Sequence, residues 1–563
     1  MKLNSEAKRI YNQITGEIKK RIILKESLAY LEHFSPTNDK GEILKRQAYF
    51  KENLKLVKPE MRNLLLKIKP IRFRKNFLYD RLLVVDESEL EKAQALGVCE
   101  VSTEPLEGYD LILSTIDVDL SVGDIAPELY IMPLWENRET LEALARIGEL
   151  TGEGSVAGEI LEGLKELDEV MKRKGLIEDL DELIAYEEKR LNEKIAEKLE
   201  KFSLTLSGKE LLEFLNELKS GNYEAIFAHF SEVEGDILSE INESEKKLSE
   251  MMLGFTVELF SRENLYPVEV SAEQIELLRH ELEKELKVEL YLKSREILEK
   301  VRPLLPKLKE ELKRAYELEF LRAVKEFTEG FTFPEIVEGG IAFINGRHLF
   351  IERPQPVSYV VGNVKVTFDG TNGEKVLILT GANSGGKTSL LELISQIIIL
   401  AHMGFPVNAE NAYVEPLDEL FFFRRKRSSY GAGAFETALR GFARSLVREG
   451  KKLILIDEFE AITEPGAAVK IIGGLLKIAH EKGFYVVIVS HLGEDLMKIL
   501  PFARVDGIEA KGLDEHLNLI VDRQPKFGVL GKSTPELIVQ RLYHKKRGRE
   551  KEIFERVLGA FRS

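Results

Sequence analysis

The residues best suited to chemistry form a glycine-rich loop in the last third of the sequence. Residues 381–388 fit the pattern G-x-x-x-x-G-K-[ST], between the strand-like run 376–380 and a helical stretch. Glycines let successive backbone N–H groups turn toward a phosphate, and the following helix presents its positive end to the same charge. The loop therefore predicts an ATP site formed by Gly381, Ala382, Asn383, Ser384, Gly385, Gly386, Lys387, Thr388 and Ser389.

Two other apolar runs end in polar side chains that suit a phosphate site. Residues 453–456 are apolar and precede Asp457 and Glu458, and the apolar run 485–489 precedes His491. Four consecutive apolar residues indicate a strand buried on both faces, and open α/β sheets bind ligands at the carboxyl ends of such strands. These polar side chains are therefore expected near the glycine-rich loop.

The polar residues divide the chemistry of ATP hydrolysis among them. Lys387 supplies a mobile positive charge to the β- and γ-phosphates, and Thr388 and Asp457 supply oxygen ligands for Mg²⁺. Glu458 polarises the attacking water, and His491 contacts the γ-phosphate. We therefore expect Lys387, Glu458 and His491 to be catalytic. A histidine after a strand more often has a structural role, which is the alternative for His491.

The elements around these residues indicate a multidomain protein. Its 563 residues correspond to about three or four domains. Strands and helices alternate over 333–545, as in a nucleotide-binding α/β domain, whereas 137–332 has long, charged, amphipathic helices typical of levers or clamp hairpins. Short strand-like runs predict a small α/β insert over 76–136. Residues 1–75 are expected to be a helical core start, and 546–563 a basic helical tail.

Composition limits the partners and the compartment. Lys and Arg total 81 against 96 Asp and Glu, a net charge of −15, so nucleic acid can be held only by local basic stretches. The strongest are 51–75, 424–427 and 545–551, although a solvated helix face is the alternative for the first. The single cysteine, Cys99, excludes a disulfide scaffold and suits a reducing compartment. The apolar runs are too short for a membrane span, and the start lacks a signal-peptide pattern, so we expect a cytoplasmic protein with no membrane partner.

The motifs have the order found in ABC-class ATPases, and their sequences resemble the MutS family. Residues 380–412 resemble that family's phosphate loop and following helix, 456–468 its Walker B segment, and 339–351 the start of its ATPase domain, with Gly346-Arg347-His348. Residues 428–438 resemble its signature segment. The resemblance is strong over 334–542. It implies a homodimer in which Ser428 and Ser429 of one protomer complete the ATP site of the other.

Departures from the family's pattern refine the resemblance. Ala382 replaces a usual proline and Ser384 a usual Met or Thr, and both are tolerable because that loop binds through its backbone. The chain is expected to lack the mismatch-recognition domain and the Smr domain. In this respect the chain resembles a short, archaeal-type member of the second MutS subfamily. Phe50-Lys51-Glu52 fits the family's mismatch-reading tripeptide. It lies in a charged helical stretch, however, and is not expected to read mispairs.

The resemblance implies an ATPase that uses ATP and Mg²⁺, forms a homodimer and binds DNA. DNA binding is expected to be non-specific and salt-dependent, and ATP binding and hydrolysis are expected to switch a DNA clamp. One alternative is recognition of mispaired or branched DNA in repair or recombination. Another is an SMC-like ATPase switch without direct DNA binding. Salt-dependent binding tests the last, and competition between homoduplex and mispaired DNA separates the first two.

Overall fold

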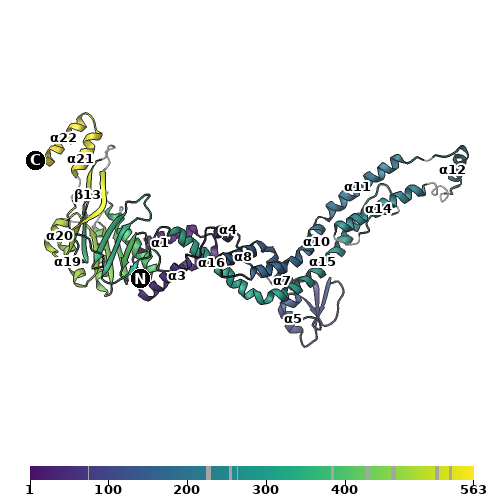
Figure 1. Cartoon of the computed structure of the whole chain (residues 1–563), viewed down its shortest axis with the longest axis horizontal. Coiled ribbons are helices and arrows are strands. Elements are labelled where there is room, and N and C mark those ends of the chain that lie inside the picture. Colours follow the sequence, from purple (N-terminus) through teal and green to yellow (C-terminus); the bar gives the residue numbers. More distant parts are fainter. Residues whose placement is uncertain are drawn as a thin grey trace. The chain divides into compact units, whose positions relative to one another are not determined.

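The computed structural model divides the chain into two compact units (Figure 1). Met1–Leu66 and Lys313–Ser563 form the first, here called the sheet unit, and Lys67–Leu312 form the second, here called the helical unit. The structure describes residues 1–73, 75–203, 205–222, 230–252, 257–262, 264–381, 386–424, 432–457, 465–513, 519–531 and 535–562. Within these ranges, none of the helices combines the length and the apolar character that a membrane crossing requires.

The central sheet of the sheet unit has seven strands: β1 (Lys2–Leu3), β8 (Val376–Gly381), β10 (Glu419–Arg424), β11 (Lys452–Asp457), β12 (Tyr485–Val489), β13 (Arg504–Leu513) and β14 (Leu519–Phe527). Their order is β1-β10-β11-β12-β8-β13-β14, and all neighbours are parallel except β13 and β14. Every residue of β8, β11 and β12 is buried. The expectation that these apolar runs form strands covered on both faces is confirmed.

Helices cover this sheet on both faces. One core joins α18 (Ala432–Val447), α19 (Pro465–Glu481) and α20 (Gly493–Ile499) to alternate residues of the buried strands, including Ile378, Ile454 and Ile488. On the other side, α17 (Lys387–Met403) contacts β11 and β12, and α1 (Ser5–Arg21) contacts α17 and β10. Two further helices near the C-terminus are α21 (Pro535–Lys545) and α22 (Arg549–Arg562).

A second, four-stranded sheet in this unit has the order β5-β9-β6-β7, with β5 at Glu335–Ile336, β6 at Gly340–Gly346, β7 at Val357–Gly362 and β9 at Asn411–Val414. The N-terminus adds the strand β1 to the main sheet, where Lys2 pairs with Glu419. Only helices were expected over 1–75, so this strand is an addition to the prediction. A strand of two residues carries no hydrophobic periodicity from which it could be found.

The remaining helices of the sheet unit enclose an aromatic cluster. They are η1 (Lys25–Ser27), α2 (Leu28–Glu32), α3 (Lys40–Asn53), α4 (Met61–Leu65) and α16 (Leu305–Phe327), of which α16 begins in the helical unit. The ring centroid of Phe50 lies 4.7 Å from those of Phe34 and Phe405, and Phe50 is 0% exposed. Phe50 is therefore a core residue and cannot reach a base pair, as the sequence analysis expected.

The helical unit contains a small parallel sheet of the order β3-β2-β4, with β2 at Leu78–Val84, β3 at Cys99–Ser102 and β4 at Leu111–Ser114. Its core includes Leu83, Cys99 and α5 (Leu90–Leu96), so the predicted strands and helix of the insert are confirmed. The helices that follow are α6 (Val122–Ile125), α7 (Glu128–Glu136), α8 (Arg138–Thr151), α9 (Ala157–Leu164), η2 (Lys165–Leu167), α10 (Asp168–Glu178) and α12 (Gly208–Ser220).

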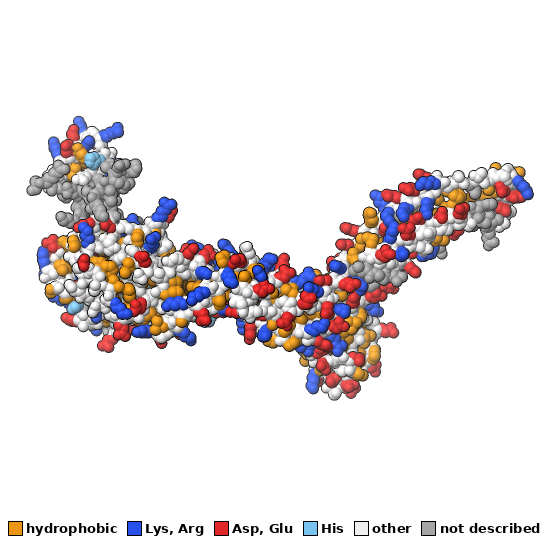
Figure 2. Space-filling view, viewed as in Figure 1, with side chains coloured by type: hydrophobic (Ala, Val, Ile, Leu, Met, Phe, Trp, Pro, Cys, Tyr) orange, Lys and Arg blue, Asp and Glu red, His pale blue; other side chains and the backbone are white. Residues whose placement is uncertain are grey.

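Three long helices, α11 (Leu180–Lys201), α14 (Ser231–Met251) and α15 (Ala272–Val301), share one apolar core in the helical unit. Glu187 on α11 contacts Ser244 on α14, and Lys194 contacts Glu240, so these two helices run antiparallel. In Figure 2, acidic and basic side chains are interspersed along them. The helix α15 ends at Val301 before η3 (Arg302–Leu304), which contains Pro303. The predicted break at the prolines is confirmed.

Candidate functional site

The sheet brings the carboxyl ends of three strands side by side, because β12 lies between β8 and β11. β8 ends at Gly381, β11 ends at Asp457, and His491 follows the end of β12. Gly381 has a φ of 113°, and a Cβ at this residue would lie 2.0 Å from the carbonyl oxygen of Ile508 on β13. Only glycine therefore allows the chain to leave β8 next to its neighbouring strand.

Lys387 is the first residue of α17, and its side chain folds back toward β8. Its Nζ donates a 2.7 Å hydrogen bond to the carbonyl oxygen of Gly381, and the side chain is buried. Gly386, directly before it, has a φ of 90°, a conformation that glycine adopts without strain. The ammonium group and the N-terminal end of α17 thus lie at the same loop, and both favour an anion there.

Thr388 and Asp457 meet although they are distant in sequence. Oγ1 of Thr388 donates a 2.9 Å hydrogen bond to Oδ2 of Asp457, which is 8% exposed at the end of β11. The contact follows from the fold, because α17 is the next element after β8 in the chain and contacts β11. A hydroxyl oxygen and a carboxylate oxygen are hard ligands of the type that Mg²⁺ prefers, so this donor set fits the ion.

The other predicted site residues differ in how far the structure describes them. His491 is exposed, and the turn that carries it is held beside β8 because the backbone N–H of Ser490 donates to the carbonyl oxygen of Leu379 at 3.1 Å. Ser389 is half-buried in the first turn of α17. The predicted residues outside the described ranges are Ala382, Asn383, Ser384, Gly385, Ser428, Ser429 and Glu458.

Arg523 on β14 is a candidate site residue that the sequence analysis missed. Its Cδ and Cγ lie 3.6 and 3.8 Å from the position that a Cβ on Gly386 would take. The exposed guanidinium is therefore a further cation beside the start of α17. No motif surrounds Arg523 in the sequence. Only the pairing of β14 with β13, and of β13 with β8, brings it to this loop.

A hydrogen-bonded network ties α17 to the end of β10, just before the predicted signature segment. Glu392 on α17 accepts a 2.6 Å hydrogen bond from Nη1 of Arg424 and lies 3.1 Å from Nε2 of His348. Burial raises the pKa of the Glu392 carboxyl, but the hydrogen bond with His348 and the charge of Arg424 lower it by more, so its pKa is below the ordinary value. Arg424, a predicted DNA contact, is therefore already paired with a protein carboxylate, whereas 425–427 lie outside the described residues.

The predicted basic stretch 51–75 begins at a cavity of the sheet unit. The cavity has a volume of ≈ 810 Å³, and its basic lining residues are Lys51, Lys55, Lys58, Arg62, Arg322 and Lys325. Nζ of Lys325 donates to the carbonyl oxygen of Val57 at 2.6 Å, and Arg322 pairs with Glu326 at 2.6 Å. Nζ of Lys51 lies 5.1 Å from the ring centroid of Phe333 and is exposed. The others are exposed, so positive charge gathers locally on an acidic chain.

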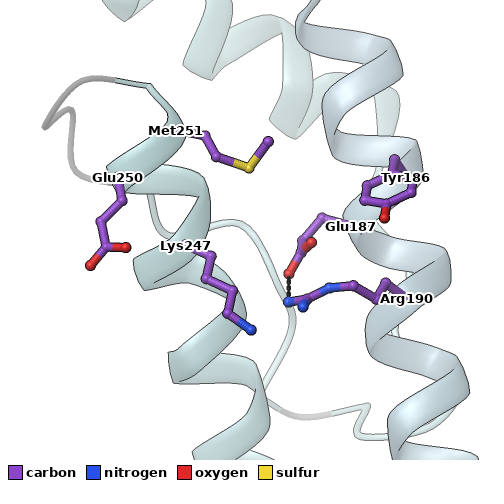
Figure 3. A pocket seen from close by; sticks show the side chains of 6 residues that line it. All are labelled: Tyr186, Glu187, Arg190, Lys247, Glu250 and Met251. Carbon is purple, nitrogen blue, oxygen red and sulfur yellow. Dashed lines mark hydrogen bonds and ion pairs between the residues drawn. The ribbon is translucent and has the colours of Figure 1, made fainter.

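A second cavity, in the helical unit, has a different character (Figure 3). It has a volume of ≈ 390 Å³ between α11 and α14, and it is lined by Tyr186, Glu187, Arg190, Lys247, Glu250 and Met251. Glu187 forms an ion pair with Arg190 and accepts a 2.6 Å hydrogen bond from Oγ of Ser244. Lys247 pairs with Glu243 at 2.9 Å. Both ion pairs lie within a single helix, and the hydrogen bond from Ser244 to Glu187 joins α14 to α11. The charged lining of this cavity is therefore paired within the hairpin.

Comparison with known proteins gives the family. DNA-binding protein MutS2 of Pyrococcus furiosus is 58% identical to this chain over 568 aligned residues, which cover the whole of both proteins. DNA mismatch repair protein MutS of Thermotoga petrophila is 24% identical over 493 residues, 81% of this chain and 58% of that protein. Endonuclease MutS2 of Gemmatimonas aurantiaca is 28% identical over 215 residues, 36% of this chain and 24% of that protein. No family model matches the chain. The full-length identity to the Pyrococcus protein nevertheless shows that the chain belongs to the MutS family, in its MutS2 branch.

Proposed function

We propose that this chain is a Mg²⁺-dependent ATPase whose active site lies at the carboxyl ends of β8, β11 and β12. One observation carries the proposal. Lys387 contacts Gly381 at 2.7 Å, and Thr388 contacts Asp457 at 2.9 Å, around a single loop. This arrangement gathers a cation, a helix N-terminus and hard oxygen ligands where a nucleoside triphosphate and its metal need them. Membership of the MutS family supports the same reaction.

Each residue then has a defined task. Thr388 and Asp457 would hold Mg²⁺, which when bound neutralises phosphate charge and polarises the transferred phosphoryl group. Lys387 neutralises the β- and γ-phosphates. Glu458 orients and polarises the attacking water, and His491 contacts the γ-phosphate. Hydrolysis therefore depends on groups from three different strand ends, so it requires the folded sheet.

Two substitutions test the ATPase proposal. Lys387→Ala should weaken nucleotide binding itself, because it removes the phosphate-facing charge. Glu458→Gln should retain ATP binding and slow hydrolysis by about a hundredfold or more, because the amide keeps the acceptor geometry and loses the base. Lys477→Ala is the matched control, because Lys477 is an exposed lysine on α19, and it should change neither nucleotide affinity nor the rate of hydrolysis. Equal nucleotide affinity in the two site variants, measured by equilibrium binding, would overturn the assignments.

We also propose that the chain binds DNA through the phosphate backbone and without preference for mispairs. The Pyrococcus relative is named a DNA-binding protein. Exposed Lys55, Lys58 and Arg62 offer local positive charge, and buried Phe50 is unable to act as a mispair wedge. Homoduplex binding should show a log–log salt slope of about −4 to −6. Neutralising Lys55, Lys58 and Arg62 together should flatten it by about two or three units.

The control for this experiment is a mispaired duplex of the same length. A preference for the mispair above about tenfold, roughly 1.4 kcal/mol, would contradict the non-specific proposal and favour recognition in repair. Binding of no duplex at any ionic strength would favour an ATPase switch that does not contact DNA.

A homodimer with shared ATP sites completes the proposal. In it, Ser428 and Ser429 of one protomer act on the nucleotide of the other, and ATP binding and hydrolysis change how the pair holds DNA. Mixing Lys387→Ala chains with Ser428→Ala chains should restore about one functional site per heterodimer, since each chain retains the part that the other lacks. Subunit exchange without any recovery of hydrolysis would count against shared sites.

A further inference from the structure

The segment that leads into β2 carries aromatic and basic side chains in alternation at the surface. Tyr79 is 84% exposed, Phe73 44% and Phe77 39%. Lys69, Arg72 and Lys75 on the same segment are also exposed. We call this surface the aromatic strip, defined by Lys69, Arg72, Phe73, Lys75, Phe77 and Tyr79. Exposed aromatic rings grouped in this way mark an interaction site more often than a lone exposed ring does.

The protein holds this segment in place without burying its rings. The backbone N–H of Lys69 donates to Oγ1 of Thr140 on α8 at 3.1 Å, and Oγ1 of Thr140 donates to the carbonyl oxygen of Lys67 at 2.9 Å. At the other end, the backbone N–H of Leu78 donates to the carbonyl oxygen of Val98 at 2.7 Å. The Leu78 side chain packs on the core of the insert. Phe77 and Tyr79, one residue to either side, therefore lie on the opposite face of the strand.

The rings form two pairs on this fixed backbone. The ring centroids of Phe77 and Tyr79 are 4.8 Å apart, and those of Phe73 and Tyr130 on α7 are 5.6 Å apart. Such pairs keep their rings ordered, so little side-chain entropy is left to lose when a flat partner stacks on them. The strip is therefore preorganised for planar groups.

The strip carries positive charge, and several of the nearby acids are paired with cations of the protein. Asp80 pairs with Arg81 at 3.2 Å, and Glu128 pairs with the same guanidinium at 2.9 Å. Asp110, at the start of β4, pairs with Lys287 at 2.8 Å. Exposed Glu100 on β3 lies beside Leu82 of β2, but residues 69–79 contain no Asp or Glu, and Lys69, Arg72 and Lys75 are exposed. The charge of the strip complements an anion.

We propose that the aromatic strip binds single-stranded nucleic acid, with bases stacked on Phe73, Phe77 and Tyr79 and phosphates held by Arg72 and Lys75. Stacking needs base faces that a duplex keeps covered, so the strip prefers a single strand to a duplex. It tolerates any sequence, because every base has an aromatic face. The inference rests on the proposed DNA binding and adds a second mode of contact to it.

The experiment measures binding of labelled oligo(dT) and of a homoduplex by fluorescence anisotropy, with the full chain. Tyr79→Ala should weaken oligo(dT) binding by about tenfold, and Phe77→Ala with Tyr79→Ala by more, while duplex binding stays within about twofold. Ile116→Ala is the matched control, because Ile116 is an apolar side chain 92% exposed on the same unit. Arg72→Gln with Lys75→Gln should flatten the salt slope for oligo(dT) by about one unit or slightly more. Since Tyr79 is so exposed, its substitution should leave the melting temperature unchanged, which keeps the test valid if the double variant misfolds.

Oligo(U) run beside oligo(dT) separates RNA from DNA, because only RNA offers a 2′-hydroxyl. Weaker binding of either single-stranded oligonucleotide by the Tyr79 variant, with duplex binding intact, supports the inference. Wild-type affinity of the Tyr79 and double variants for both single strands overturns it, and leaves the duplex-binding proposal standing. Absence of binding to any nucleic acid overturns both.

Discussion

An ion pair on the central sheet and an ion pair on the long helix α15 differ sharply in their exposure to solvent. In the sheet unit, Arg504 and Asp506 on β13 form an ion pair at 2.8 Å with side chains 2% and 0% exposed. In the helical unit, Lys293 and Glu296 on α15 form an ion pair at 3.0 Å with side chains 40% and 57% exposed. A buried charge must be matched by a fixed partner, whereas an exposed charge is matched by water. The pair on β13 is thus held in a fixed position by its partners in the protein, whereas the pair on α15 lies largely in water.

This difference follows from how each unit buries its apolar surface. The strands β8, β11 and β12 are covered on both faces, so polar groups near their ends lie in a medium of low dielectric constant. Each long helix of the helical unit buries one stripe and leaves the rest to solvent. A reaction that needs charges at fixed positions is therefore better suited to the ends of the buried strands. The second arrangement suits surfaces that contact a large partner.

The largest effect is expected from breaking the buried pair of the sheet unit. Asp506 accepts hydrogen bonds from Arg504 and, at 2.8 Å, from the hydroxyl of Tyr359. Asp506→Asn leaves the buried Arg504 cation with only Glu374, at 3.4 Å, as a counter-charge and should lower the free energy of unfolding by about 3–5 kcal/mol. Urea unfolding measures this change. Asp495→Asn, which breaks an exposed pair with Lys498 on α20, should cost less than about 1 kcal/mol, and equal costs would contradict the comparison.

A smaller effect is expected from pH, through a buried histidine at the end of α17. Burial lowers the pKa of His402 to about 4. Its Nε2 accepts a 2.8 Å hydrogen bond from the backbone N–H of Leu417, which requires the neutral ring. The unfolded chain takes up a proton near pH 6.5 and the folded chain does not, so stability is lost as pH falls from about 6.5 toward 4.

Unfolding at pH 7 and pH 4.5 measures this loss. Between these pH values, the free energy of unfolding of His402→Gln should fall by roughly 2–3 kcal/mol less than that of the unmodified protein, because the variant has no titrating group at this position. Subtracting the change measured for His402→Gln from the change measured for the unmodified protein removes the contribution of carboxylates, because both proteins contain the same carboxylates. An identical pH dependence in the two proteins would mean that His402 is not buried as a neutral ring.

The sequence predicted those parts of the site that depend on local signals. Glycines, one lysine and one threonine within a short loop identify the start of α17, and four apolar residues before Asp457 identify β11. Each signal lies within one element and its flanks, so periodicity and backbone preference suffice to find it. The contact between Thr388 and Asp457 follows from these local signals together with one general rule. Parallel strands place their carboxyl ends at the same edge of a sheet, so the residues that follow them come close together.

Other parts depend on contacts between distant segments. Arg523 reaches Gly386 only because β14 turns back on β13, and β14 has no pattern that marks it as a neighbour of the loop. The contact of Glu392 with His348 and Arg424 joins three separate segments. The sequence analysis singled out His348 and the basic stretch that begins at Arg424, but it identified neither Glu392 nor the pairing of the three residues. Long-range pairing of polar groups is set by topology, and single-sequence patterns carry little information about it.

Arg523 allows a third, smaller test within the sheet unit. Arg523→Ala should weaken ATP binding by about tenfold, because it removes one exposed cation near the phosphates and leaves the loop intact. Equilibrium nucleotide binding measures the change. Lys526→Ala on the same strand is the control, since Lys526 pairs with Glu509 at 2.6 Å. Wild-type affinity of the Arg523 variant would place its guanidinium away from the nucleotide.

The smallest effect is expected from the exposed pair of the helical unit, and it completes the comparison. Hydrogen bonding to Glu296 raises the pKa of Lys293, but both side chains are largely in water. Solvent screening and the entropy of two long side chains oppose the attraction between them, so Glu296→Ala should change the free energy of unfolding by less than about 0.5 kcal/mol. Alanine also has a higher helix propensity than glutamate, which offsets part of any loss within α15. Urea unfolding of this variant and of Asp506→Asn under the same conditions gives the ratio of the two effects. A cost for Glu296→Ala that approached the cost for Asp506→Asn would mean that the ion pairs of the helical unit act as a connected network, since isolated exposed pairs cannot supply that energy.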